Sequence, residues 1–139
     1  MRFIKTLLKN IIMYNNQEEK KMLKVYLSGA ITGKNYDTVK REFKDAEKMV
    51  KKYGRNIHVY NPMRKNTRKD LGPQAKDWTV YMRQSIRDLV DSDVMVDVLN
   101  GSENSKGVMV ERVICEVLKI PVYDINTFHK FYDKDDSRV

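Results

Sequence analysis

Cysteine and histidine are scarce in this 139-residue chain, which contains Cys115, His58 and His129 as its only residues of these types. A single cysteine excludes an intramolecular disulfide and is compatible with the reducing cytoplasm. Three such residues cannot supply the four ligands of a closed structural zinc site. Cys115 lies in an apolar helical stretch, which favours core packing. We therefore expect no disulfide framework, no metal site and no cofactor.

Long hydrophobic runs are also absent, since no apolar segment approaches the roughly 20 residues of a membrane-spanning helix. No membrane span is expected. Hydrophobic residues make up 41% and charged residues 33% of the chain, as in ordinary globular domains. The net charge of +8 favours anionic partners: nucleic acid, free nucleotides or an acidic surface.

Residues 1–21 form an N-terminal amphipathic extension, and residues 22–139 are expected to form a single domain. Apolar side chains recur at helical spacing in the extension: Phe3, Ile4, Leu7, Leu8, Ile11 and Ile12. Lys5 and Lys9 interrupt the segment, which argues against a signal peptide. The helix is expected to pack on the domain or on a partner subunit. The alternatives are membrane-surface attachment and a poorly ordered extension preceding a translation start at Met22.

Strand and helix patterns alternate along the rest of the chain. Strands are predicted at residues 24–27, 56–60, 93–99 and 120–125. Helices are predicted at residues 36–53, 77–91, 105–119 and 128–132, with a long polar loop at 63–76. This alternation predicts an α/β fold, a Rossmann/flavodoxin-like open parallel sheet of four to five strands with helices on both faces. With the strand order 2-1-3-4, the switch point where ligands bind lies between strands one and three.

The first segment at that switch point is Ser28-Gly29-Ala30-Ile31-Thr32-Gly33, which follows the first strand. Its glycines allow backbone to approach a ligand closely, and successive N–H groups favour an anion. The segment has neither the Walker spacing nor the dinucleotide-binding fingerprint. A turn that merely connects strand to helix remains the alternative.

The second segment, residues 105–111, opens the third helix of the alternating pattern. Ser105 is suited either to cap this helix or to bind a phosphate or sugar hydroxyl. Glu111 lies near the positive end of the helix dipole, which is expected to keep its carboxylate ionised, as a nucleophile requires. A solvated glutamate on a helix surface is the alternative.

Several short motifs in order resemble the nucleoside 2-deoxyribosyltransferase superfamily. They are the segment from Tyr26 to Gly33, the strand sequence DSDVMVDV and the pattern Ser-x-Gly-x-x-x-Glu at residues 105–111. The SG-x-x-T-G loop, Asn61-Pro62 and the Tyr-Met-Arg triplet at 81–83 are similar to the small phage-associated branch. That branch is related to deoxynucleoside 5′-monophosphate N-glycosidases. The resemblance covers residues 23–125.

The resemblance implies cleavage of an N-glycosidic bond in a nucleoside or nucleotide, in the cytosol of a bacterium or a phage-infected host. It implies that Glu111 is the nucleophile and that Tyr26 orients its carboxylate. It places the 5′ end of the ligand at Ser105 and Gly107, and the loop that starts at Ser28 along the pocket. The loop residues assigned to ligand binding are Ser28, Gly29, Ala30, Ile31 and Gly33. Relatives build their pockets with help from a neighbouring subunit, so a homodimer or larger homo-oligomer is expected.

Two departures from the family pattern concern the leaving base and the phosphate. The family has an aspartate eight residues before the acid that opens the third strand, and here that position is Ser85. A serine cannot donate a proton at neutral pH, so Asp97 or Asp88 is a candidate substitute, and Ser85 is expected to face the pocket. Ala30 and Thr32 stand where related monophosphate hydrolases have serine and arginine. The basic residues of the 63–76 loop are candidates to compensate: Arg64, Lys65, Arg68 and Lys69.

Three classes of function remain open from the sequence. The first is an N-glycosidase or deoxyribosyltransferase-like enzyme. The second is a catalytically weak protein that sequesters a nucleotide or nucleotide-derived signal, which Ser85 favours. The third is a nucleic-acid-binding protein, favoured by the net charge and by a basic row on the first predicted helix of the domain. The row comprises Lys40, Arg41, Lys44, Lys48, Lys51 and Lys52.

Overall fold

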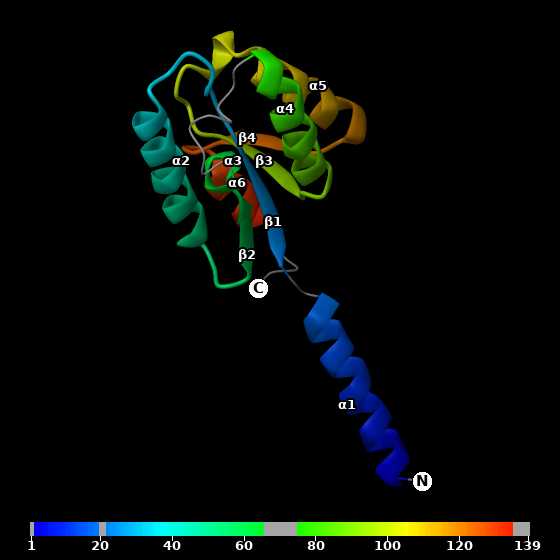
Figure 1. Cartoon of the computed structure of the whole chain (residues 1–139). Coiled ribbons are helices and arrows are strands. Elements are labelled where there is room, and N and C mark those ends of the chain that lie inside the picture. The colour runs from blue at the N-terminus through cyan, green and yellow to red at the C-terminus, as the bar shows by residue number, and fades with distance from the viewer. Residues whose placement is uncertain (1, 20–21, 66–74, 135–139) are drawn as a thin grey trace.

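A parallel four-stranded sheet forms the centre of the computed structural model, which describes residues 2–19, 22–65 and 75–134 (Figure 1). The strands are β1 (Leu23–Ser28), β2 (Ile57–Tyr60), β3 (Val94–Asp97) and β4 (Val122–Asp124). Their order is β2-β1-β3-β4, and every neighbouring pair is parallel. The predicted fold class and strand order are confirmed.

Six α-helices and one 3-10 helix accompany the sheet in the described residues. They are α1 (Arg2–Glu19), α2 (Tyr36–Lys51), α3 (Pro62–Lys65), α4 (Ala75–Val90), η2 (Ser102–Asn104), α5 (Lys106–Leu118) and α6 (Phe128–Lys134). The short helix α3 occupies the start of the loop predicted at 63–76. The strand predicted at 93–99 ends at Asp97, because the Asp97 carboxylate accepts the Leu99 N–H at 2.7 Å and Leu99 adopts φ 59°. A local turn therefore replaces the end of the predicted strand.

Helices cover both faces of the sheet, as predicted. Successive side chains of β1 point to opposite faces, so apolar side chains on each face need a helix to pack against. Val25 and Leu27 pack with Phe43 of α2 and Phe128 of α6. Tyr26 lies on the other face, in the second apolar cluster with Leu89, Met95 and Cys115. Figure 1 shows α2 on one side of the sheet and α4 and α5 on the other. The burial of both faces explains why β3 is apolar at every position but its last.

The carboxyl ends of β1 and β3 lie side by side, with Ser28 in register with Asp97. The Val98 N–H donates to the Ser28 carbonyl at 2.9 Å, which extends this contact one residue beyond the strands. The chain then leaves β1 toward α2 on one face and leaves β3 toward α5 on the other. This divergence is the predicted switch point, and it creates space between the two connecting segments.

Helix α1 extends away from the sheet in Figure 1. Every described side chain of α1, from Arg2 to Ile11, is exposed, and Phe3 is 78% exposed. The expectation that this helix packs on its own domain is therefore wrong for the side chains from Arg2 to Ile11. The side chain of Ile12 lies outside the described residues. Within the described ranges, we find no helix of the length and apolarity that crossing a membrane requires.

Candidate active site

A small cavity of about 20 Å³, open to solvent, lies at the switch point. It is lined from four directions: the end of β1 with its following loop, the residue that opens α3, one face of α4, and the first turns of α5. The lining residues are Tyr26, Leu27, Gly29, Ile31, Thr32, Pro62, Trp78, Tyr81, Met82, Ser105, Gly107, Val108 and Glu111. A space of this size holds about one ordered water molecule.

Glu111 is held in this cavity by the buried face of α5. Ser105 caps the helix by accepting the Val108 N–H at 3.3 Å, which fixes where the helix begins. Val108, Glu111 and Cys115 then follow at helical spacing on the side that faces the sheet. The carboxyl of Glu111 is only 4% exposed. A buried carboxyl needs hydrogen-bond donors, and β1 supplies them.

Two β1 side chains donate to the Glu111 carboxyl. The Ser28 hydroxyl donates to Glu111 Oε1 at 2.9 Å. The Tyr26 hydroxyl also hydrogen-bonds to this carboxyl. Tyr26 and Ser28 point to the same face of the sheet because they are two residues apart on one strand. The predicted pairing of Tyr26 with Glu111 is thus present in the structure, and Ser28 is a second donor.

Burial raises the pKa of Glu111 to about 7, against the lowering effect of the Tyr26 and Ser28 hydrogen bonds and with a smaller raising contribution from Asp97. The sequence interpretation expected the α5 dipole to keep this group ionised. Burial instead raises the pKa of this enclosed side chain, so the carboxyl is only partly ionised at neutral pH. Near neutral pH the carboxyl exchanges readily between its protonated and ionised forms.

This raised pKa has a consequence for stability that can be measured. The folded protein binds the Glu111 proton more tightly than the unfolded chain, whose pKa is about 4.5. The resulting stabilisation is fully present below pH 4.5 and is lost as the pH rises through 7. We expect the free energy of unfolding of the native protein to fall by about 3 kcal/mol relative to Glu111→Gln over this interval. Urea unfolding of both proteins at pH 5 and pH 8 measures this difference.

The glutamine variant is its own control, because the amide cannot ionise while every other titrating group is retained. Parallel pH profiles for the two proteins would show that Glu111 has an ordinary pKa and is not enclosed as described.

Tyr81 brings a second phenol to the same carboxyl from α4. Burial and the proximity of Glu111 raise the pKa of both Tyr26 and Tyr81 well above the usual value for tyrosine. Both phenols are therefore neutral and available as hydrogen-bond donors. Ser85 hydrogen-bonds to both of them and is 4% exposed. Ser85, which was expected to face the pocket, is not among the residues that line the cavity, but it binds two tyrosines that are.

Asn100 fastens the β1–α2 loop to the loop that follows β3. Its Oδ1 accepts the Ala30 N–H at 2.7 Å, and its Nδ2 donates to the Ala30 carbonyl at 2.9 Å. The same Nδ2 donates to Glu42 on α2 at 2.7 Å. Lys34 closes the network by donating to the Asn100 carbonyl at 2.7 Å and pairing with Glu42 at 3.1 Å. These contacts hold the loop beside the cavity in one conformation.

The close contact between the β1–α2 loop and the loop after β3 also explains why residue 29 is a glycine. A Cβ at this position would lie 2.5 Å from Val98 Cγ2 and 2.8 Å from Asn100 Oδ1. Residue 29 must be a glycine because there is no space for a Cβ atom, and not because the backbone has an unusual φ.

Replacing Asn100 by alanine is expected to lower the free energy of unfolding by about 1–3 kcal/mol, because it removes both side-chain hydrogen bonds to the Ala30 backbone and one of the hydrogen bonds to Glu42. Chemical denaturation measures this loss. Asn104→Ala is the matched control, since Asn104 is exposed on the same connection. Equal stability of the two variants would show that the Asn100 contacts do not restrain the loop.

The remaining residues predicted to bind ligand divide into three groups. Gly29, Ile31, Ser105 and Gly107 line the Glu111 cavity. Ala30 lines an adjoining groove instead. Gly33 lines neither space, and it has φ 78° in an exposed turn where an added Cβ would meet no atom within 4 Å.

Asp97 lies on the same face of the sheet but is committed to other contacts. Its carboxylate accepts the Ser102 hydroxyl at 2.7 Å and pairs with Arg112 at 2.8 Å. It also accepts the Leu99 N–H. Asp97 lines neither cavity among the described residues, and Asp88 does not line them either. The contacts of Asp97 fix the turn after β3 rather than reach the ligand space.

The basic residues expected to compensate at the phosphate end are not brought to the cavity where they are described. Arg64 pairs with Glu47 of α2, a side chain that also binds Asn61. The side chains of Lys65, Arg68 and Lys69 lie outside the described residues.

The adjoining groove has a volume of about 710 Å³ and is open to solvent. It is lined by Ala30, Ile31, Thr32, Lys34, Trp78, Asn100, Gly101, Asn104, Ser105, Lys106 and Gly107. The Lys106 ammonium lies 4.8 Å from the centre of the Trp78 ring, within cation–π range. Among the residues whose positions are described, no group of three or more His, Cys, Asp or Glu side chains is arranged to hold a metal.

The chain belongs to the family described as a domain of unknown function, DUF4406, whose model matches residues 23–124. The match covers all four strands and every described residue of both cavities. No curated protein matches the chain.

Several residues that line the cavity were not assigned to ligand binding from the sequence. They include Pro62, Trp78 and Met82. All three line the cavity. Leu89, further along α4, packs in the second apolar cluster, whereas Trp78 and Met82 at the start of the helix line the cavity.

Proposed function

We propose that the protein binds a nucleoside or nucleotide and breaks its N-glycosidic bond, with Glu111 as the nucleophile, in the cytosol of a bacterium or phage-infected cell. One observation supports this most strongly. A buried carboxyl, held by the hydroxyls of Tyr26 and Ser28, lies on the wall of a small cavity at the switch point, beside a larger groove. The motif resemblance to nucleoside 2-deoxyribosyltransferases agrees with this placement.

In the first step an ionised Glu111 oxygen attacks the anomeric carbon of the sugar and forms an ester bond to it. The bond from that carbon to the base nitrogen breaks, and its electron pair stays on the base, which takes up a proton. Positive charge develops on the sugar during this step, and the nearby carboxylate stabilises it. The Tyr26 and Ser28 hydrogen bonds keep the carboxyl in one orientation for attack.

In the second step an acceptor attacks the same carbon and releases Glu111. If the acceptor is water, its oxygen remains on the sugar, its proton is lost, and the protein is a hydrolase. If the acceptor is another base, the protein is a transferase. The cavity is open to solvent, which favours water as acceptor.

Incubation with a panel of nucleosides and nucleoside monophosphates, followed by chromatography, tests the proposal. Free base at a rate well above the protein-free reaction is the expected result. Adding a second free base distinguishes transfer, which yields a new nucleoside, from hydrolysis. Absence of free base from every compound would contradict the proposed activity.

Ser85 favours a second candidate, a protein that sequesters a nucleotide with little turnover. The position of the family's assisting aspartate holds a hydroxyl, and Glu111 is the one carboxyl among the described residues that line the cavity. A leaving base would then depart without a strong proton donor. Tight binding of a nucleotide without base release selects this candidate over the enzyme.

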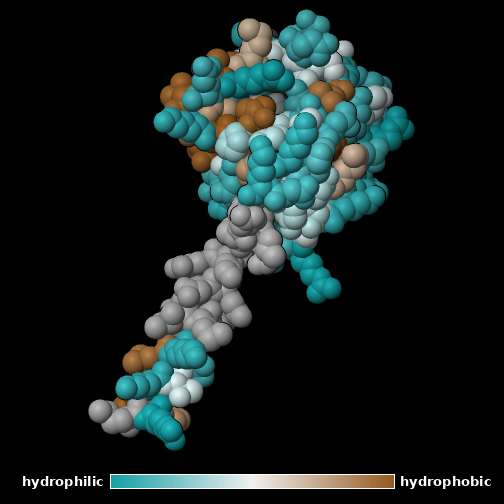
Figure 2. Space-filling model, turned by 180° about the vertical axis from the view of Figure 1, so that it is seen from behind, coloured by the Kyte–Doolittle hydropathy of each residue, from teal (hydrophilic) through white to brown (hydrophobic). Residues whose placement is uncertain are grey.

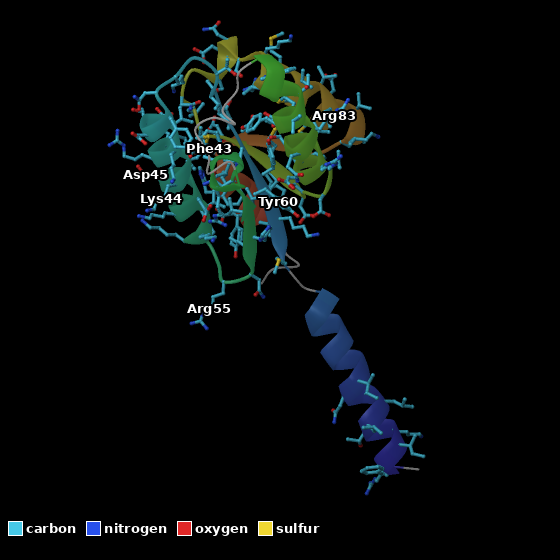
Figure 3. All side chains as sticks on the ribbon, viewed as in Figure 1. Phe43, Lys44, Asp45, Arg55, Tyr60 and Arg83 are labelled. Carbon is cyan, nitrogen blue, oxygen red and sulfur yellow. The ribbon has the colours of Figure 1, made fainter. Side chains whose placement is uncertain are left out.

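The nucleic-acid interpretation remains a less favoured prediction. Figure 3 shows Lys44 and Arg55 directed away from the domain, while Phe43 points from α2 toward the sheet. Acidic side chains are interspersed with the basic ones on the exposed face of α2, as with Asp45 beside Lys44. A mixed surface of this kind is also typical of an ordinary solvated helix.

We propose that the expected homodimer forms through the outer face of α5. Figure 2 shows apolar atoms gathered on this side of the domain. Met109, Val113 and Val117 recur every fourth residue there and are 61%, 59% and 72% exposed. They form a row opposite Glu111 that is complementary to itself in an antiparallel pair centred on Val113.

Val113→Lys is therefore expected to convert a dimer into a monomer, because two ammonium groups would meet at the centre of the pair. Light scattering coupled to size-exclusion chromatography measures the mass of each form. Val80→Lys on α4, equally exposed at 67%, is the matched control. A native protein that is monomeric at high concentration would contradict the proposed interface.

A further inference from the structure

Helix α1 has an apolar side that is exposed to solvent. Phe3, Leu7 and Ile11 recur at every fourth position, which places them in one row along the helix. Ile4 and Leu8 lie beside this row, each three residues before one of its members. The exposed fractions of these side chains run from 46% at Ile11 to 78% at Phe3. An exposed apolar patch of this kind marks a surface that binds a partner.

The other side of the same helix is basic. Arg2, Lys5 and Lys9 are spaced three and four residues apart, so they share one side, which is opposite the apolar row. Residues 1–11 contain no aspartate or glutamate. Thr6 lies near this side, exposed and uncharged, and its hydroxyl donates to the Arg2 carbonyl at 3.1 Å. Figure 2 shows hydrophobic and hydrophilic residues together at this end of the molecule. A helix with one apolar and one basic side is typical of membrane interfaces.

Charge distinguishes between the candidate partners of this helix. Two copies that paired over residues 2–11 would bring their basic side chains together, with no acid in that segment to offset them. The chain as a whole has a net charge of +8, so its own surface has no excess of acid to attract the helix. An anionic lipid surface offers acyl chains to the apolar side and phosphates to the basic side. The charges therefore favour a lipid surface over a second copy.

We propose that α1 anchors the protein to an anionic membrane surface. The helix lies in the plane of the interface, with its apolar row toward the acyl chains and its basic side toward the headgroup phosphates. It precedes the amino end of β1 at Leu23, whereas the Glu111 cavity lies at the carboxyl end of that strand. Anchoring through α1 therefore leaves the cavity accessible to dissolved ligand. The proposal does not depend on the glycosidase activity.

Sedimentation of the full chain with lipid vesicles measures this binding. Vesicles of mixed phosphatidylglycerol and phosphatidylcholine supply an anionic surface, and vesicles of phosphatidylcholine alone supply a neutral one. We expect the partition coefficient to be about tenfold or more higher on the anionic vesicles, because each basic residue near such a surface adds to the attraction. The difference should decrease as salt is added, since salt screens these charges.

Leu7→Gln tests the apolar side without changing the charge. It is expected to weaken binding to the anionic vesicles about tenfold or more, because an apolar side chain no longer enters the acyl layer. Thr6→Gln is the matched control, since Thr6 is the neighbouring residue and lies outside the apolar row. It should bind as the native protein does.

Lys9→Gln tests the basic side and is expected to weaken binding to the anionic vesicles about fivefold. Its matched control is Lys44→Gln, which removes an exposed lysine from α2. This control should bind nearly as well as the native protein. Equal losses for the two variants would show that the charge of the whole protein, and not α1, attracts it to the vesicles.

Three other results would overturn the proposal. The first is equal partition of the native protein onto anionic and neutral vesicles, or onto neither. The second is equal binding by Leu7→Gln and Thr6→Gln, which would show that the apolar row does not enter the lipid. The third is a lower molecular mass of Leu7→Gln than of the native protein in light scattering without lipid, which would assign the apolar row to a second copy of the chain.

Discussion

Replacing Glu111 by glutamine is expected to reduce base release by about 10⁴-fold or more, the scale observed when a covalent nucleophile is removed. Glutamine has nearly the same shape and still accepts the Ser28 hydrogen bond, but its neutral amide is a poor nucleophile. The variant should bind ligand with an affinity similar to that of the native protein. Steady-state chromatography of free base measures the rate, and calorimetry measures binding.

Glu116→Gln is the matched control, since Glu116 lies on the same helix and is exposed. It should retain the native rate. Near-normal turnover by Glu111→Gln would show that another group is the nucleophile. A variant that fails to fold would be recognised by its circular dichroism spectrum, and Glu111→Ala would then be measured in its place.

Introducing an acid at position 85 is expected to accelerate cleavage by about 10²–10⁴-fold, the usual contribution of general acid catalysis. Ser85 hydrogen-bonds to Tyr26 and Tyr81, and both tyrosines line the cavity with Glu111. A carboxyl in this enclosed place beside Glu111 would be held protonated by burial and by the neighbouring negative charge. Ser85→Asp would then supply a proton to the departing base through the Tyr81 hydroxyl.

Ser85→Asn separates proton donation from shape, because asparagine matches aspartate in size and cannot act as an acid. The expected result is a large gain for aspartate and none for asparagine. Equal rates for both variants would contradict the assignment of position 85. So would a native protein that is already as fast as Ser85→Asp. Because Ser85 is 4% exposed, denaturation should accompany the kinetics. Unfolding of Ser85→Asp would show that the position belongs to the core.

The fold was predictable because its signals are local and repeat along the chain. Each strand is a short apolar run ended by turn residues, and each helix has one apolar stripe. The parallel arrangement of the strands then follows, because helices connect one strand to the next. The errors lie where a single contact overrides the local pattern. The early end of β3 depends on the Asp97 carboxylate binding the Leu99 N–H, which no apolar periodicity encodes.

The candidate site was partly predictable for a different reason. The segments that contain Ser28 and Glu111 could be grouped because the carboxyl ends of central strands meet at the switch point. The pairing of Tyr26 with Glu111 was implied only by the family resemblance. The Asn100 network could not be deduced in the same way. It joins Asn100 to residues 70 and 58 positions away in the chain. Its position just after β3 was a usable signal, since polar residues at that edge of the sheet face the ligand space.

The pKa of Glu111 could not be predicted from the position of the residue on its helix alone. The distance from the helix N-terminus is visible in the sequence and favours the charged form. The enclosure of the side chain by α4 and β1 is not visible there, and it raises the pKa to about 7. Burial is a property of the whole fold, so it had to be observed.

The formation of a sugar ester on Glu111 is the central claim, and intact-mass spectrometry tests it most directly. A nucleotide carrying fluorine at the 2′ position slows hydrolysis of such an ester, because the fluorine disfavours the oxocarbenium-like state of the second step. Mixed with the native protein, it should release base and leave one glycosyl unit attached to the peptide that contains Glu111. Base release with no adduct on Glu111, or an adduct at another residue, would contradict the account.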